Sequence, residues 1–307
     1  MTTPHPIILH HFEQSPFSEK IRVVFGLKNV EWSSVLISRI MPRPDLMPLT
    51  GGYRRTPVMQ IGADIYCDTQ CIIRELERRF PEPTLFPPGF EGLGSASAMW
   101  TDRPFFQNTV NLVFGSLADQ VPQDFIADRE KLRGAKFDVP AMTAAIPQMR
   151  DQFRAHLQWI ENQLAEGRSW MSGANAALCD VNAYMNIWCV RSPNAGELLA
   201  EFPATCAWET RMSAIGHGHR SEISTSAALE IAAGATPHTA ELSDPNDPNG
   251  RKPGDRVEIV PDDYGKIKVS GDIVALSSHH VAIRRRDPRA GDVVVHFPRA
   301  GFFVLPA

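Results

Sequence analysis

The stretch FEQSPFSEKIRVVFGL, Phe12 to Leu27, contains the change from strand to helix that decides the fold. The apolar run before it, residues 7–12, predicts a short buried strand. Apolar residues at helical spacing predict a helix from Ser18 to Leu27. The turn between them holds Ser15 and Pro16, where a helix N-terminus presents unpaired backbone N–H groups and a partial positive charge. Such a turn favours a bound anion.

The hydroxyl of Ser15 gives this turn a possible chemical role. It can donate a hydrogen bond to a thiolate held over the helix N-terminus, which stabilises the anion and lowers the pKa of the thiol. A free thiol of pKa about 8.5 is only a few per cent thiolate at pH 7, and lowering the pKa to about 6.5 gives roughly 20-fold more thiolate. The alternative interpretation is a helix start without chemistry.

The first 85 residues read as one α/β unit around this turn. A second strand is expected at residues 31–38, and its helical connection to the first strand predicts a parallel pair. Residues 56–62 and 63–67 are typical of an antiparallel hairpin with Gly62 at its turn. Asp68 is then expected to cap a further amphipathic helix. The predicted order is β-α-β-α-β-β-α, followed by a Pro-rich linker at 81–92.

Two features at the strand ends add to the argument from Ser15. Thr56-Pro57 lies at the start of a predicted strand, and a cis bond there would turn the backbone of Thr56 outward, toward an extended peptide. Asp68 and Thr69 lie at a helix N-terminus, where a carboxylate can take a ligand ammonium and N–H groups can hold a ligand carboxylate. Each feature also has an ordinary interpretation, as a strand start or as a helix cap.

The middle of the chain predicts an all-helical domain over residues 94–235. Strand signals are absent from Ser95 to about Ala233, and Pro104 is expected to kink a long helix. A core-facing stripe of apolar residues at spacings of three and four runs through residues 146–164.

The end of the chain changes character after a linker at residues 236–255. Short alternating runs over residues 250–307 predict a small β domain, as a barrel or a sheet. This segment has ten Lys and Arg against seven Asp and Glu, and few aromatic residues, so nucleic-acid binding is not expected. We expect it to dock on its own chain, either covering a pocket of the helical domain or extending a contact between subunits.

Composition limits the classes of function. The 307 residues suit two domains with room for a small third, and 43% hydrophobic with 21% charged residues is typical of soluble globular proteins. A net charge of −4 gives no general attraction to nucleic acid, and neither a membrane-spanning run nor a secretory signal is expected. Five cysteines without a C-x-x-C pair suggest reduced thiols in a cytoplasmic protein.

Taken together and in this order, these segments resemble the glutathione transferase (GST) superfamily, over roughly residues 1–225. SPFSEKIRVVFGL looks like the serine-type active-site turn and first helix, and RRTPV looks like the segment with the family's cis-proline. DTQCIIRELERRF looks like the glutathione-binding helix, and RSWMSGANAALCDVNAY (168–184) looks like the hallmark of the helical domain. The resemblance implies a bacterial-type serine-class member with an extra C-terminal β domain, and a thioredoxin-like fold for residues 1–85.

The resemblance also implies roles for individual residues. Ser15 would hold the glutathione thiolate for attack on a small apolar electrophile, in a conjugation or in a related isomerisation or dehalogenation. The glutathione-binding residues would be Phe17, Arg55, Thr56, Pro57, Asp68 and Thr69. Among these, Arg55 would reach the glycine carboxylate, Thr56 would pair through its backbone with the cysteinyl part, and Asp68 with Thr69 would hold the γ-glutamyl end.

Other consequences concern the helical domain and the assembly. Trp100, Phe105 and Phe106 are candidates for the electrophile pocket, although aromatic residues at such spacing also build cores. Asp180 would be structural, and family members usually form homodimers. No metal is expected, because the histidine pairs His10–His11 and His279–His280 lack further ligands at a matching spacing.

The sequence also departs from the family pattern. Asp68-Thr69 stands where Glu-Ser is usual, Arg55 replaces a lysine, and Ala177 lacks the hydroxyl of the usual capping box, which is worth about 1 kcal/mol. Tyr53 and Arg54 could line the site or anchor their loop. These departures, with the added C-terminal segment, leave an alternative function open, that of a catalytically weak binding or scaffold protein with the GST fold.

Overall fold

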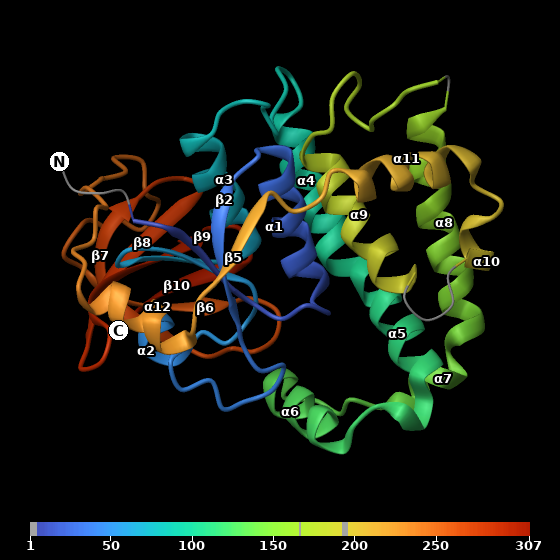
Figure 1. Cartoon of the computed structure of the whole chain (residues 1–307). Helices are drawn as coiled ribbons and strands as arrows, with labels where there is room; N and C mark the ends of the chain where they lie inside the picture. Colours follow the sequence, from blue (N-terminus) through green and yellow to red (C-terminus); the bar gives the residue numbers. More distant parts are fainter. Residues whose placement is uncertain (1–4, 166, 192–195) are drawn as a thin grey trace.

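The computed structural model describes residues 5–165, 167–191 and 196–307. Figure 1 shows a β-rich half, which holds both ends of the described chain, beside a half made of helices. The fold class is as predicted, a thioredoxin-like domain with a helical domain and a C-terminal extension of strands.

The N-terminal elements follow the predicted order. They are β1 (Ile7–His11), α1 (Pro16–Leu27), β2 (Glu31–Leu36), α2 (Leu46–Thr50), β3 (Val58–Ile61), β4 (Asp64–Cys67) and α3 (Thr69–Arg79). β1 pairs in parallel with β2 and antiparallel with β3, and β3 pairs antiparallel with β4. The parallel pair and the hairpin are therefore confirmed.

The helical half begins after the Pro-rich linker. Its elements are α4 (Glu91–Trp100), the π-helical turn η1 (Thr101–Phe105), α5 (Phe106–Leu117), the 3₁₀ turn η2 (Ala118–Gln120), α6 (Gln123–Arg133), α7 (Val139–Ala144), α8 (Ile146–Leu164), α9 (Leu178–Arg191), α10 (Gly196–Leu199) and α11 (Pro203–Ala214). Pro104 lies inside the π-helical turn, which joins α4 to α5. One apolar core runs from α1 into α8 and α9, so the two halves share it.

The chain then returns to the sheet, which corrects the expectation of helix alone up to Ala233. Strand β5 (His219–Glu222) pairs in parallel with β2 at the sheet edge, and α12 (Thr225–Ala233) follows. All four residues of β5 are exposed, and their sequence HRSE has no strand pattern of its own. Pairing with the free edge of β2 creates this strand, so local sequence could not reveal it.

The C-terminal strands continue the N-terminal sheet and do not form a separate unit. They are β6 (Arg256–Pro261), β7 (Val269–Leu276), β8 (His280–Asp287), β9 (Gly291–Pro298) and β10 (Phe302–Pro306). The ten-stranded sheet has the order β10-β6-β7-β8-β9-β4-β3-β1-β2-β5. Only three residues link β9 to β10. Because β10 nevertheless pairs with β6, at the other end of these five strands, the five strands must curve back toward β9.

The seam of this extension is the parallel pairing of β4 with β9, in which Ile65 lies opposite Val295. β4 would otherwise be an exposed edge with unpaired backbone groups. A second apolar core fills the space behind the seam, and Tyr53 packs there against Phe297 and Phe302. The segment thus docks on its own chain, as expected, but chiefly through the edge of the N-terminal sheet and not over a pocket of the helical domain. Tyr53 anchors its loop.

Candidate functional site

Three segments singled out in the sequence meet at one end of the N-terminal sheet. One row across the sheet is formed by His10, Val58 and Cys67. Because β1 and β4 both run antiparallel to β3, the chain leaves β1 and β4 at the end where it enters β3. The turn with Ser15, the Thr56–Pro57 bond and Asp68 therefore converge at this end.

Ser15 caps α1 and keeps its hydroxyl proton free. The residue is buried, and its Oγ accepts a hydrogen bond from the backbone N–H of Ser18 at 3.2 Å. Within the described residues the hydroxyl donates to no other group. It can therefore donate to an anion at the N-terminus of α1, where the helix dipole adds to the attraction.

Thr56 leaves its backbone open. The Thr56–Pro57 bond is cis, and the Thr56 Oγ1 accepts a hydrogen bond from Arg43 at 3.0 Å. The backbone N–H and C=O of Thr56 have no hydrogen-bond partner in the part of the chain that the structure describes. Backbone polar groups without a partner can pair with an extended peptide, as a strand does.

Asp68 caps α3 and holds a carboxylate without a cation. Its φ of 76° lies in a region that side-chain-bearing residues rarely adopt, and its carboxylate accepts from the N–H of Gln70 at 2.9 Å. No ion pair to Asp68 occurs among the described residues. Burial raises the pKa of Asp68 and Asp102 adds to this, against the hydrogen bond from Gln70 and the more distant Arg55 and Lys20. A ligand ammonium would balance this charge.

Arg55 and Arg54, by contrast, are already engaged. Arg55 donates to the Asp263 carboxylate and to the Tyr264 carbonyl, and the Tyr264 ring lies 4.1 Å from its guanidinium carbon. Burial alone would lower the pKa of Arg55, but Tyr53, Tyr264 and Asp263 raise it. Arg54 binds both oxygens of Asp128 in α6 at 2.6 Å, so it anchors its loop.

The three candidate pocket aromatics differ in their surroundings. Phe105 is fully buried in the helical core, where it stacks on Trp100, so its side chain offers no surface to a ligand. Trp100 is partly buried and donates through its indole N–H to His156 at 3.0 Å. Phe106 packs edge to face on Phe17, with ring centroids 4.7 Å apart. The core interpretation therefore holds for Phe105, and Phe106 is the candidate that contacts the Ser15 turn.

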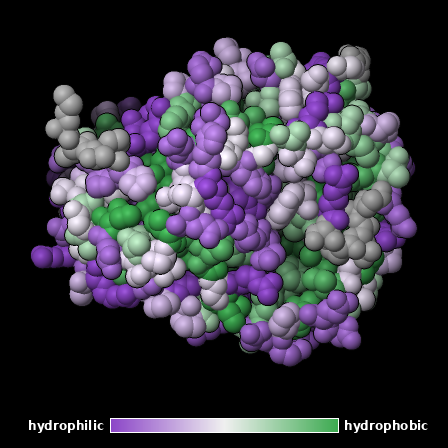
Figure 2. Space-filling model, in the orientation of Figure 1, coloured by the Kyte–Doolittle hydropathy of each residue, from purple (hydrophilic) through white to green (hydrophobic). Residues whose placement is uncertain are grey.

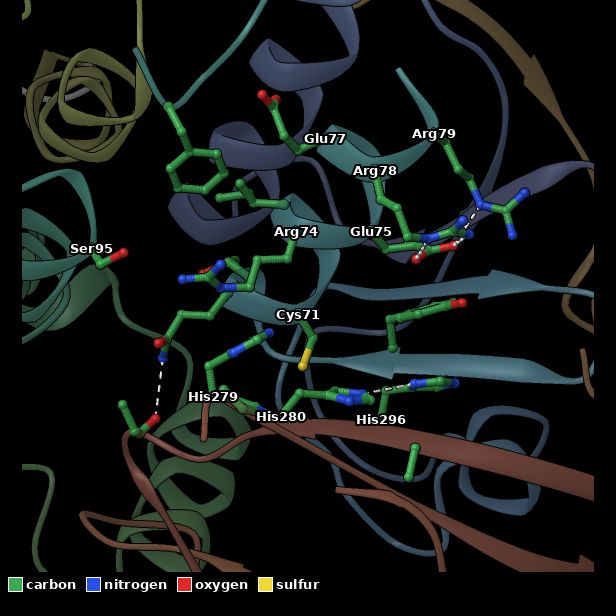
Figure 3. A pocket seen from close by; sticks show the side chains of 18 of the residues that line it. Cys71, Arg74, Glu75, Glu77, Arg78, Arg79, Ser95, His279, His280 and His296 are labelled. Carbon is green, nitrogen blue, oxygen red and sulfur yellow. Dashed lines mark hydrogen bonds and ion pairs between the residues drawn. The ribbon is translucent and has the colours of Figure 1, made fainter. Parts of the chain in front are cut away.

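A groove of about 1070 Å³ lies beyond α3, between this helix, α4 and the extension (Figure 3). Thr69 and Gln70 line one part of it, and Arg74, His279 and His280 line another. In Figure 3, His280 and His296 point toward each other, and their ring nitrogens are 3.0 Å apart. Within the described ranges, no group of three or more His, Cys, Asp or Glu side chains could hold a metal ion.

Sequence reasoning missed several residues around the site. Lys20, almost fully buried, pairs with Asp102 at 2.6 Å, and Arg103 pairs with Asp262 at 2.7 Å. The ion pair between Asp263 and Arg55 was not predicted either. Each pair joins segments more than 80 positions apart, so no local pattern marks them.

The face of the molecule in Figure 2 is mixed in polarity. In the view of Figure 2, hydrophobic residues form separate small patches among hydrophilic ones. Of the helices that the structure describes, none has the length and apolar character needed to cross a membrane.

Comparisons with known proteins identify similar chains. A family model described as the glutathione S-transferase N-terminal domain matches residues 9–84, and a model of a domain of unknown function matches residues 109–220. The crystal structure of a GST-like protein from Pseudomonas syringae is 36% identical, with a TM-score of 0.83, over 99% of this chain and 100% of that one.

Two further relatives share less of the chain. FtsZ-localized protein A from Caulobacter vibrioides is 26% identical over 180 residues, which are 57% of this chain and 73% of that protein. The theta-class glutathione S-transferase from Xanthomonas axonopodis pv. citri, solved with glutathione bound, is 21% identical, with a TM-score of 0.52, over 67% of this chain and 92% of that one. The second likeness is one of fold alone.

Proposed function

Because the chain belongs to the glutathione S-transferase superfamily, we propose that it binds a glutathione-type thiol at the sheet end where Ser15, Thr56 and Asp68 converge. The observation that carries this proposal is the pair of free polar groups at two helix N-termini. The Ser15 hydroxyl can donate to a thiolate, and the Asp68 carboxylate has no cation partner among the residues that the structure describes. The open backbone of Thr56 would pair with the cysteinyl part between them.

The proposed reaction is thiol transfer to a small electrophile. The thiol loses its proton to solvent, the thiolate accepts a hydrogen bond from Ser15, and its sulfur attacks an electrophilic carbon while the bond to the leaving group breaks. Thr69 would support the γ-glutamyl end beside Asp68. Phe17 and Phe106 would offer an apolar surface to the electrophile.

The test compares two serines that both cap helices. Ser15 caps α1 and Ser224 caps α12, each accepting one backbone N–H, at 3.2 and 3.1 Å. Ser15→Ala and Ser224→Ala should each lower the free energy of unfolding by about 1 kcal/mol. Only Ser15→Ala should raise the pKa of bound glutathione, read from thiolate absorbance, and lower kcat/KM toward chlorodinitrobenzene by about 10- to 20-fold.

Titration calorimetry with reduced glutathione decides whether the site exists. Saturable binding at micromolar to low-millimolar concentration is expected for the wild type. No binding of either reduced glutathione or its glycine ethyl ester up to about 10 mM, where even a 1 mM Kd corresponds to about −4 kcal/mol, would refute the proposal.

A second candidate function is that of a binding or scaffold protein that kept the fold. Two observations favour it, the engagement of Arg55 by the chain's own Asp263 and the similarity to FtsZ-localized protein A. In that case Ser15→Ala would leave the biological activity unchanged. We also propose that the protein is cytoplasmic, because its five free cysteines suit a reducing compartment. We further propose that it forms a homodimer, so light scattering should give a mass near twice 34.1 kDa.

A further inference from the structure

The C-terminal extension reaches across the mouth of the proposed thiol site. We call residues 262–268, between β6 and β7, the bridging loop. Asp262 pairs with Arg103 of η1, and its N–H donates to the Gly301 carbonyl at 3.0 Å. Gly265, with a φ of 59°, lies so close to α6 that a Cβ there would come within 2.8 Å of Leu132. The loop thus contacts η1 and α6 of the helical half.

A second part of the extension touches α3 beside the site. The side chain of Gln70 donates to the carbonyl of Ala300, in the turn between β9 and β10, at 3.3 Å. This turn lies at the site end of the sheet because β9 runs parallel to β4. The extension therefore forms part of the rim near Asp68 and near Arg55.

The charges at the mouth are unevenly balanced. Three cations of the segments around the site each already have a carboxylate of the same chain. The pairs are Lys20 with Asp102, Arg103 with Asp262 and Arg55 with Asp263. Asp68 has none among the described residues. In the part of the chain that the structure describes, the site therefore offers an unpaired negative charge to a ligand ammonium, whereas these three cations are already paired.

At Arg55, Asp263 is the residue that occupies the positive charge. Its carboxylate faces the guanidinium with both oxygens, one of them at 3.4 Å, while the Tyr264 carbonyl accepts from the same guanidinium and the Tyr264 ring covers it. A ligand carboxylate that approaches Arg55 must compete with Asp263 and meets its negative charge. Like charges at such a distance repel strongly in a partly buried site.

We propose that Asp263 determines which thiols the site binds. The site takes thiol peptides whose end at Arg55 carries no free carboxylate. This inference rests on the proposed binding of a glutathione-type thiol. The preferred ligand has a free ammonium for Asp68, a sulfhydryl for Ser15 and an uncharged end, an ester or an amide, under the bridging loop.

The experiment compares two thiols that differ in this charge, glutathione and its glycine ethyl ester, by calorimetry on the full chain. The wild type should bind the ester about tenfold more tightly than glutathione. Asp263→Asn, which keeps the shape and removes the charge, should improve glutathione binding about tenfold and change ester binding little. The side chain of Asp263 is 31% exposed, so the variant should fold, and its thermal midpoint verifies this.

A matched control and the opposing outcomes make the test decisive. Asp272→Asn removes the same charge from the same extension, at an exposed pair with Arg256, and should alter neither affinity. The inference is overturned if the wild type binds glutathione at least as tightly as the ester and Asp263→Asn leaves the ratio unchanged. If neither thiol binds to any of the proteins, the proposed function itself fails, and this inference fails with it.

Discussion

At the scale of single residues, Asp180 organises the start of α9 and the contact with α11. Its buried carboxylate accepts hydrogen bonds from the backbone N–H of Met171 at 2.8 Å, from that of Ala177 at 3.0 Å and from the indole N–H of Trp208 at 2.7 Å. Burial raises its pKa, against these three bonds. Ala177 lacks a capping hydroxyl, yet its own N–H donates to this carboxylate.

Asp180→Ala should therefore be one of the most destabilising substitutions in the helical half. It leaves three buried donors without an acceptor, and we expect a loss of about 3 kcal/mol or more in the free energy of unfolding in urea. Asp138→Ala is the control, because Asp138 caps α7 at a partly exposed position, through one bond from the Ala141 N–H, and otherwise pairs, among the described residues, only with the exposed Lys136. It should cost about 1 kcal/mol. Equal losses for the two variants would contradict this account.

At the scale of elements, the seam between β4 and β9 depends on polar groups as well as on strand pairing. Asp64 of β4 is buried and accepts from the His238 N–H at 2.7 Å, from the Thr239 hydroxyl and from His296 of β9 at 3.2 Å. His296 also stacks on Tyr66, with ring centroids 4.2 Å apart. One carboxylate thus joins the first domain, the linker and the extension.

Asp64→Ala should loosen this seam. Three donors lose their acceptor, so we expect about 2–4 kcal/mol lower stability and faster proteolytic cleavage in the linker, residues 236–255. Asp272→Ala breaks an exposed pair with Arg256 in the same sheet and should cost less than about 0.5 kcal/mol. A linker that resists protease equally in both variants would show that Asp64 does not hold the seam.

At the scale of the whole molecule, three histidines make the fold sensitive to acid: His10 and His11 are buried, and His280 is partly buried. Burial lowers the pKa of His10 to about 4 despite its bond to Gln60, and burial with the charge of Arg22 lowers that of His11 to about 3. Burial and His296 lower the pKa of His280 to about 3. All three are therefore neutral in the folded chain at pH 5.

In the unfolded chain the three histidines bind protons near pH 6.5, well above their pKa values in the folded chain. Their contribution to the free energy of unfolding is therefore fully present above pH 6.5 and is lost as the pH drops toward about 4. The slope should reach about 4 kcal/mol per pH unit with all three titrating. Urea unfolding at pH 7.5, 6.5 and 5.5 measures it, and His10→Gln should reduce it by about a third. A free energy of unfolding that stays constant from pH 7 to pH 5 would contradict the prediction.

Several features of the fold could be predicted from sequence because they are local. The turn at Ser15, the hairpin at residues 56–67 and the cap at Asp68 each follow from short patterns of apolar residues, glycine, proline and capping side chains. Their convergence follows too, because parallel and antiparallel connections fix which strand ends meet. The fate of the aromatic candidates did not follow, since periodicity does not separate Phe105 in the core from Phe106 at the turn.

The sequence by itself determined the order of strands and helices in the N-terminal half, the helical half and the three segments of the candidate site, because local propensity and strand order suffice for these. The resemblance to a known family then implied the thioredoxin-like fold. Only the tertiary structure decided that β5 and β9 join the edges of the N-terminal sheet, and that Asp263 reaches Arg55. The physical reason is that edge pairing and ion pairs join distant segments through groups that every strand and every charged side chain possesses, so they leave no local signature.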